Sequence, residues 1–450
     1  MAVTKLNDDI LTEIIPFLCI RDALALGATC SFLRRPAVRH AVRDVTFDSA
    51  AAVTKFSAFM LSKPNERIPH FRRLSVKSGI VNNSLLFLAA LSPLAELVFQ
   101  ASKLEHLSLH CAELLLSMEP LFPHAIARHP QLTSLELSTT GENAQGVLLK
   151  MRCAPNLRHL ALLERTYLPQ DVPSGKIDLP PLPRLETLTL DGTKALPPRA
   201  TLRMLAPALH ELRLNDIKFR DSDPASGAWW PDSLTHLRGD IPSLVSLRIH
   251  RPVRSLHVDV TLENERAWDP APLYDILQRA SPVELTIGMQ TSLKQAFWQT
   301  YASVLPRLRC LKLVVEDGHV DHQEIANWLE NMSKPGPTSL HAVRVYVHGP
   351  SREVADLGYE PVLRAMSHSL QALRLFGFTT SSEPCPENIN DSRFAWWTAD
   401  LSNKEGSPNS PEGAPAETRR EEWRTLSAEQ AGRVFAEEAK DLSASSQRTE

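Results

Sequence analysis

The stretch Leu104-Glu-His-Leu107-Ser-Leu109 carries the pattern LxxLxL, which recurs along the middle of this 450-residue chain. The first leucines of the five clearest copies lie 28, 25, 28 and 24 residues apart, at Leu104, Leu132, Leu157, Leu185 and Leu209. Along an extended strand, side chains alternate between two faces, so both leucines of LxL turn to the same side. One such strand cannot fold alone, whereas a stack of many buries a continuous leucine core.

Weaker copies extend the pattern as far as residue 380. They are Leu244…Ile249, Val253…Val258, Leu285…Ile287, Leu308…Leu313, Leu340…Val345 and Leu370…Leu375. Nine residues from Leu244 to Val253 are too few for a repeat, so this interval is either a hairpin-like irregularity or includes a copy that is not a true repeat. A period of 20–29 residues is typical of leucine-rich repeats. We therefore expect an α/β fold: an irregular leucine-rich-repeat solenoid with parallel strands on its concave face.

The composition narrows the class of protein. The formal net charge is -3, whereas a general nucleic-acid binder usually carries a basic excess. The six cysteines include no CxxC pair, so neither a zinc site nor a disulfide framework is indicated. The longest apolar stretch, Leu85–Phe99, is too short and too interrupted to span a bilayer. We expect a protein of the cytoplasm or nucleus that has neither nucleic acid nor membrane as a partner.

Residues 1–44 follow a different pattern, which predicts three short helices. Ile10, Ile14 and Leu18 recur at helical spacing, and Asp22 suits the first turn of a second helix. About forty residues is near or below the size that stabilises itself. The stretch nevertheless carries more large apolar side chains than a small three-helix core can hide. A surplus of this kind usually marks a protein-binding site.

This stretch resembles an F-box, the module through which receptors of Skp–cullin–F-box ubiquitin ligases bind the Skp-family adaptor. The family pattern has Leu-Pro and an acidic residue at its start, Ile/Leu along the first helix, Asp-Leu at the second, and Cys with an aromatic near the third. The matching residues here are Leu6, Asp9, Ile10, Ile14, Leu18, Asp22, Leu24, Cys30 and Phe32. Asn7 replaces the proline, Ala23 replaces a leucine, and Phe32 replaces a common tryptophan. We expect Pro16 to kink or end the first helix.

An F-box-like module followed by leucine-rich repeats is similar to the leucine-rich-repeat class of F-box proteins. The resemblance covers about a tenth of the chain. It implies a non-catalytic substrate receptor, without a cofactor, that reaches a cullin through the adaptor. The adaptor-binding residues that it implies are Leu6, Ile10, Ile14, Leu18, Asp22, Leu24 and Phe32. Two alternatives stay open: the helices only cap the solenoid, or the chain is a repeat scaffold without a ubiquitin role.

The residue between the last two apolar positions of each copy should face the concave surface. The first four copies have no basic residue there, but later copies carry Arg213, Arg248, Lys312, Arg344 and Arg374. We hypothesise a basic stripe that favours an acidic or phosphorylated segment of an unknown protein substrate. The alternative is that these are ordinary solvent-facing charges, neutralised locally by Glu211, Asp259 and Glu284.

Beyond the module, we assign residues 45–380 to the solenoid, with 45–100 as transitional first repeats. Residues 401–417 are rich in Ser, Pro, Gly and Glu, so we expect 381–450 to be largely disordered. A short helix over 418–442 is the exception we consider.

Motifs for catalysis are missing from the sequence. No GxGxxG, GxxxxGK[ST], GxSxG or HExxH occurs. His319, His322 and Glu324 form HxxHxE, which is better explained as a solvated loop than as a metal site. The pairs Trp229–Trp230 and Trp396–Trp397 either anchor loops to the solenoid, which is the commoner case, or form a recognition surface.

Overall fold

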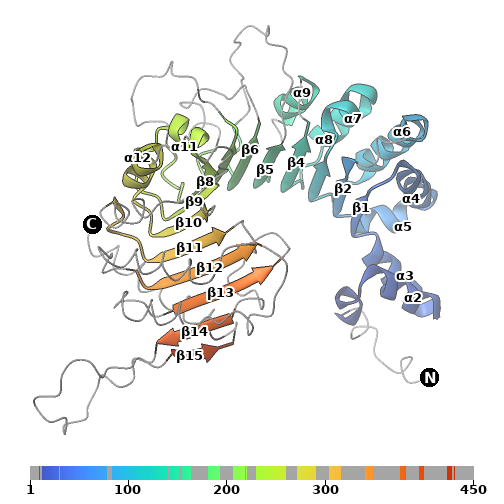
Figure 1. Ribbon diagram of the computed structural model, residues 1–450. Helices are drawn as coiled ribbons and strands as arrows, with labels where there is room; N and C mark the ends of the chain where they lie inside the picture. Colours follow the sequence, from blue (N-terminus) through green and yellow to red (C-terminus); the bar gives the residue numbers. More distant parts are fainter. Residues whose placement is uncertain are drawn as a thin grey trace, which may run out of the picture. The chain divides into compact units, whose positions relative to one another are not determined.

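The computed structural model describes residues 10, 13–29, 31–78, 84–139, 142–151, 155–163, 181–192, 206–217, 219, 230–259, 271–289, 304–315, 340–348, 375–381, 395–399, 423–427 and 430. The chain forms two compact units, Met1–Leu234 and Thr235–Glu450, which we call unit 1 and unit 2 and describe separately. Figure 1 shows unit 1 in blue to green and unit 2 in yellow-green to red.

Unit 1 begins with short helices. Ile10 and Ile14 are helical, and the 3-10 helix η2 (Ile15–Phe17) contains Pro16. Leu18 then leaves in an extended conformation (φ -84, ψ 147), so the expected helix end at Pro16 is confirmed. The helices that follow, and that pack against each other, are α2 (Ile20–Thr29) and α3 (Ser31–Ala41).

The repeats of unit 1 form one parallel sheet whose strands pair in chain order. These strands are β1 (Asp44–Phe47), β2 (Arg73–Val76), β3 (His106–Leu109), β4 (Ser134–Ser138), β5 (His159–Leu163), β6 (Thr187–Asp191) and β7 (Glu211–Asn215). Helices cover one face of the sheet (Figure 1). They are α4 (Ala50–Ser62), α5 (Pro64–Arg67), the 3-10 helix η3 (Ile68–His70), α6 (Ser84–Gln100), α7 (Ala112–Met118), α8 (Leu121–Ala127) and α9 (Glu142–Lys150).

The leucines of the repeats form the core of unit 1. Strand register sets one leucine of each repeat beside the next, in the row Leu74, Leu107, Leu135, Leu160, Leu188 and Leu212. All six are buried, at 6% exposure or less. This row confirms the parallel solenoid that the LxxLxL spacing predicts.

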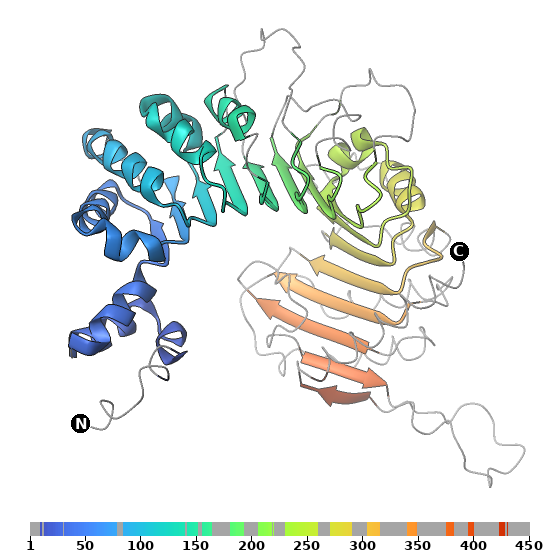
Figure 2. The ribbon, with the colours of Figure 1, turned by 180° about the vertical axis from the view of Figure 1, so that it is seen from behind.

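In unit 2 the strands again pair in chain order. The parallel strands are β8 (His236–Asp240), β9 (Ser255–Asp259), β10 (Glu284–Met289), β11 (Cys310–Val315), β12 (Ala342–His348) and β13 (Leu375–Ser381). Figure 2 shows β13 followed at the edge by two short antiparallel strands, β14 (Ala395–Ala399) and β15 (Trp423–Leu426). Two helices, α11 (Ile241–Leu247) and α12 (Ala271–Ala280), pack against each other.

The first repeat of unit 2 differs from the sequence prediction. Strand β8 begins two residues after Leu234 and has Gly239 where the pattern asks for a third leucine. Leu244 and Leu247, which the prediction placed on a strand, are buried residues of helix α11. Of the two explanations offered for the short interval before Val253, the copy that is not a true repeat is therefore correct.

The C-terminal strands also differ from expectation. Both β14 and β15 lie within residues 381–450, where the composition predicts little regular structure. β15 moreover occupies residues 423–426 of the range considered for a helix, 418–442. β14 pairs with β13 and β15 pairs with β14, and this antiparallel pairing supplies the backbone hydrogen bonds that a short strand lacks on its own. In the described part of the chain, no helix has the length and apolar character needed to cross a membrane.

Candidate functional site

The N-terminal helices expose most of their large apolar side chains. Six of them, between 41% and 89% exposed, form what we call the N-terminal apolar face: Ile10, Ile14, Phe17, Ile20, Leu24 and Phe32. The residues that these helices bury are few and mostly small, namely Ile15, Ala23, Gly27, Leu33 and Ala37. The surplus of apolar surface that the sequence predicts is therefore confirmed.

The packing of α2 on α3 explains why the large side chains point outward. Ala23 and Gly27 lie one helical turn apart and are both buried. A Cβ atom on Gly27 would come within 2.7 Å of the Ala37 Cβ, so the two helices cross at very close range. Small residues at the crossing leave no room for larger ones. Ile20 and Leu24, also one turn apart, remain on the exposed side of α2.

A hydrogen bond between α3 and the preceding chain adds to this arrangement. The Nε2 of His40, in the last turn of α3, lies 3.1 Å from the Leu18 carbonyl oxygen. The contact ties the loop after η2 to the end of α3. Phe17, the residue just before Leu18, is 89% exposed. An aromatic ring held in solvent beside a fixed loop is well placed to contact another polypeptide.

The predicted adaptor-binding residues gather mostly on this surface. Ile10, Ile14, Leu24 and Phe32 are exposed members of the apolar face, Asp22 is exposed, Leu18 is half-buried, and Leu6 lies outside the described residues. The sequence prediction did not select Phe17 and Ile20. Two signals could have found them: Phe17 follows the helix-ending Pro16, and Ile20 precedes Leu24 by one turn.

The energy available from covering the face is substantial. Full burial of a large apolar side chain contributes about 1.5–3 kcal/mol, and all of these side chains except Phe17 are already about half buried. Covering six of them would therefore release about 5–9 kcal/mol. Association costs about 4–15 kcal/mol in lost translational and rotational freedom. The face can offset much of that cost and contribute the central part of a protein interface.

A second candidate surface is a row of polar residues on unit 2. Strand register aligns the central residues of successive strands, which are Arg238, His257, Thr286, Lys312 and Arg344. This row begins with Arg238, which the sequence prediction missed because Gly239 hides the repeat. Arg248, predicted for the row, instead caps the end of α11 in the left-handed conformation (φ 52). That prediction was wrong, and Arg374 lies outside the described residues.

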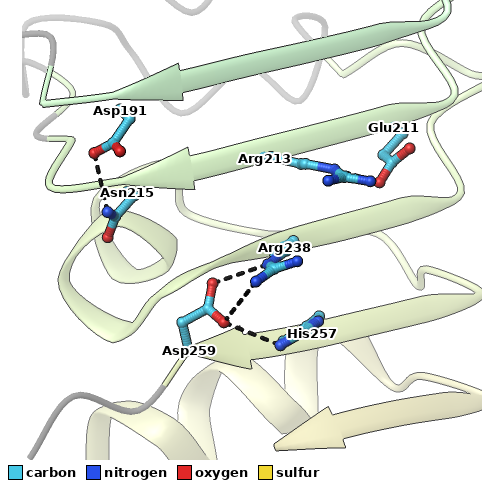
Figure 3. Close-up of polar contacts among 7 residues, drawn as sticks. All are labelled: Asp191, Glu211, Arg213, Asn215, Arg238, His257 and Asp259. Carbon is cyan, nitrogen blue, oxygen red and sulfur yellow. Dashed lines mark hydrogen bonds and ion pairs between the residues drawn. The ribbon is translucent and has the colours of Figure 1, made fainter. Parts of the chain in front are cut away.

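Part of this row is neutralised by Asp259, as Figure 3 shows. The Asp259 carboxylate accepts from Arg238 Nε at 3.1 Å and lies 3.0 Å from His257 Nε2. Burial alone would raise the pKa of Asp259, but the hydrogen bonds and charges of His257 and Arg238 outweigh it and lower the pKa to about 2. The carboxylate therefore stays ionised at neutral pH and holds both partners in place.

In unit 1, the central residue of strand β7, Arg213, also forms an ion pair. Arg213 Nε donates to the Glu211 carboxylate at 2.7 Å, and Asn215 Nδ2 donates to the Asp191 carboxylate at 2.9 Å (Figure 3). The local neutralisation that the sequence raised as an alternative is therefore present at Arg213 and Arg238. Lys312 and Arg344 of the unit 2 row are half-buried and adjacent in register, and Arg344 Nη2 donates to Cys310 Sγ at 3.6 Å.

The remaining sequence features are the HxxHxE motif and the two tryptophan pairs. Among the described residues, no three His, Cys, Asp or Glu side chains are grouped so that they could hold a metal ion. His319, His322 and Glu324 lie outside the described residues, as does Trp229. Trp230 is 2% exposed, which fits an anchoring role. Trp396 and Trp397 belong to strand β14.

Comparison with known proteins gives little further information. No protein-family model matches the chain, and no curated protein matches it in sequence. Among solved structures, the complex of Rad7 and Elc1 in yeast matches with a TM-score of 0.33 and 13% sequence identity. The match covers 78% of this chain and 92% of that chain. A likeness at this level supports no conclusion about function.

Proposed function

We propose that this protein is a substrate-recognition adaptor of a Skp–cullin–F-box ubiquitin ligase. The observation that carries the proposal is the N-terminal apolar face, whose side chains the protein's own first repeat leaves exposed. The F-box resemblance of the same residues names the partner that would cover this face, the Skp-family adaptor. The leucine-rich repeats would then hold the protein to be ubiquitinated.

The mechanism requires positioning alone. The adaptor and cullin would bring the activated ubiquitin, and the repeats would keep a substrate lysine within its reach. Holding two reactants close together raises their effective concentration without a catalytic side chain in this chain. A receptor of this kind would work in the cytoplasm or nucleus.

Co-purification with the Skp-family adaptor tests the proposal. We expect full-length protein to recover the adaptor, and the double variant Ile10→Asp/Leu24→Asp to lose most of it, since a truncated or charged interface anchor costs at least about 2 kcal/mol. Leu114→Asp/Leu121→Asp is the matched control, because both leucines are exposed, at 37% and 50%, on the repeat helices α7 and α8. If wild type and the Ile10→Asp/Leu24→Asp variant recover equally little adaptor, the protein is instead a repeat scaffold without a ubiquitin role.

For the substrate, we propose an acidic or phosphorylated segment that contacts the unit 2 row. Lys312 and Arg344 are neighbours in register there, and Arg side chains suit carboxylate and phosphate groups. Charge reversal of both residues should reduce the recovery of substrates found by proximity labelling under proteasome inhibition. Unchanged recovery of these substrates would show that the unit 2 row is not part of the recognition surface. It would not count against the proposed binding of the adaptor.

A further inference from the structure

A groove of about 830 Å³ lies where the N-terminal helices meet the first repeat. Its walls come from α2, α3, β1 and α4, and its exposed large apolar side chains are Ile20, Leu24 and Phe59, at 45%, 44% and 39% exposure. Ile20 and Leu24 also belong to the N-terminal apolar face, so the face and the groove are continuous. Arg67 covers one face of the Phe59 ring, 3.6 Å from its centroid, and a partner that covered only residues 1–44 would leave the remaining exposed part of Phe59 and the α4 wall outside the interface.

On its α3 side the groove is lined by one charged residue, and two further cations of α3 are exposed outside its lining. Arg34 lines the groove, and Arg35 and Arg39 are exposed on the same helix. The carboxylate that lines the groove, Asp44, lies 3.6 Å from Arg73 and is paired with it. Among the residues that the structure describes, the guanidinium groups of Arg34, Arg35 and Arg39 have no ion-pair partner.

In the neighbouring repeats, by contrast, an arginine has a carboxylate as its ion-pair partner. Arg72, which directly precedes strand β2, forms an ion pair with Glu105 at 3.2 Å. Burial first, and then the charges of Arg39, Arg72, Lys103 and Arg35, lower the pKa of His70, so Arg35 and Arg39 lie near this histidine of the first repeat. Unpaired cations beside an apolar groove favour a partner that brings both apolar and acidic side chains.

We propose that this groove receives an amphipathic helix of the adaptor, with apolar side chains against Leu24 and Phe59 and acidic side chains against Arg34 and, outside the lining, against Arg39. An amphipathic helix lying in an apolar groove is a common mode of peptide recognition. The inference rests on the proposed function and extends it. The interface runs beyond residue 44 onto the first repeat, and the contacting segment of the adaptor is acidic.

Binding of the full-length chain to purified Skp-family adaptor, measured by titration calorimetry, tests the inference. We expect Phe59→Ala to weaken binding at least about tenfold, as for a buried interface aromatic. Arg34→Glu/Arg39→Glu should weaken it about tenfold at low salt and much less in about 0.5 M NaCl, where exposed charges are screened. The control Arg128→Glu/Lys150→Glu reverses two exposed cations at the ends of α8 and α9 and should bind as wild type.

The outcomes separate the two proposals. If Phe59→Ala and Arg34→Glu/Arg39→Glu bind as wild type while Ile10→Asp/Leu24→Asp does not bind, the groove is not part of the interface and the proposed function stands. If wild type does not bind the adaptor at all, both proposals fail. Light scattering adds one further result: a wild-type dimer that Phe59→Ala dissociates would assign the groove to a second copy of this chain and overturn the inference.

Discussion

The N-terminal helices and the repeats of unit 1 use similar side chains but bury them very differently. In the repeats, Leu107 and Leu109 are fully buried because the strands on both sides supply a leucine or a valine at the matching position. In the helices, Ile14 and Leu24 remain 41% and 44% exposed, since α2 and α3 meet through small residues. A stacked array completes its core from its own neighbours. Among the described residues, no such neighbour covers Ile14 and Leu24 of the N-terminal helices, and we propose that another polypeptide does so.

The largest expected effect compares one leucine from each region. Leu135→Ala should lower the free energy of unfolding by about 2–5 kcal/mol, because Leu135 is 1% exposed in the core of the repeats. Leu24→Ala should cost less than about 1 kcal/mol, since its side chain is already half in solvent. Urea unfolding of the full chain measures both. Equal losses would mean that the chain itself covers Leu24, contrary to our description.

A second pair of variants examines how tightly the module itself is packed. Gly27→Ala places a Cβ 2.7 Å from that of Ala37 and should destabilise the α2–α3 pair by about 1–3 kcal/mol. Gly146→Ala in α9 meets no atom within 4 Å and should stabilise its helix by about 0.5–1 kcal/mol. Hydrogen exchange at the amides of α2, α3 and α9 distinguishes the two local effects. Similar small gains at both sites would contradict the close crossing of α2 and α3.

Acid should weaken the repeats of unit 1 through buried histidine. Burial lowers the pKa of His129, which is 4% exposed, although a hydrogen bond to the Val98 backbone acts in the opposite direction. Because the unfolded chain then binds the proton more readily, stability is constant above the unfolded pKa of about 6.5 and falls below it, by at most about 1.4 kcal/mol per pH unit. His129→Leu should flatten this dependence in unfolding curves measured from about pH 7.5 to about pH 5.5, roughly one pH unit on either side of the unfolded pKa.

The matched variant for this test is His124→Leu, which replaces an exposed histidine of α8. It should leave the pH dependence close to that of wild type. If the free energy of unfolding depends less on pH in both variants to the same extent, the burial of His129 is not the cause of that dependence.

The smallest expected effect concerns the polar row of unit 2. Asp259→Asn removes the carboxylate that pairs with Arg238 and His257, and should cost about 1 kcal/mol at neutral pH, because the site is partly exposed. The pKa of Asp259 is lowered to about 2, so this stabilisation is present above about pH 4 and lost as pH falls through about 2. The free energies of unfolding of wild type and Asp259→Asn should therefore become equal as the pH is lowered. A constant difference down to the lowest pH would point to a packing effect instead.

The parts of the fold that were predictable are those that depend on local pattern. LxxLxL spacing reveals the strands because each strand has to turn two leucines into the core, and the size of residues 1–44 reveals the surplus of apolar side chains. The placement of Arg248 failed because Leu244 and Leu247 of α11 imitate the strand pattern. Helix signals were present there: Asp240 is the N-cap, accepting from the Ser243 amide at 2.7 Å, and Pro242 lies in the first turn.

Other features depend on distant contacts that no local pattern carries. Strand β15 forms by antiparallel pairing with β14, although the intervening sequence is polar. Arg238 belongs to the unit 2 row only because β8 pairs with β9, and Gly239 conceals that strand from a search for leucines. The groove beside Phe59 needs α3 and α4 together, which residues 1–44 alone cannot indicate.

Hydrogen–deuterium exchange of the full-length chain, with and without the Skp-family adaptor, is the most direct measurement of whether a second polypeptide covers the N-terminal apolar face. We expect the adaptor to slow exchange in α2, α3 and α4 while leaving strands β3 to β7 unchanged. Exchange that is unaltered throughout these helices, or slowed only in the repeats, would contradict the account.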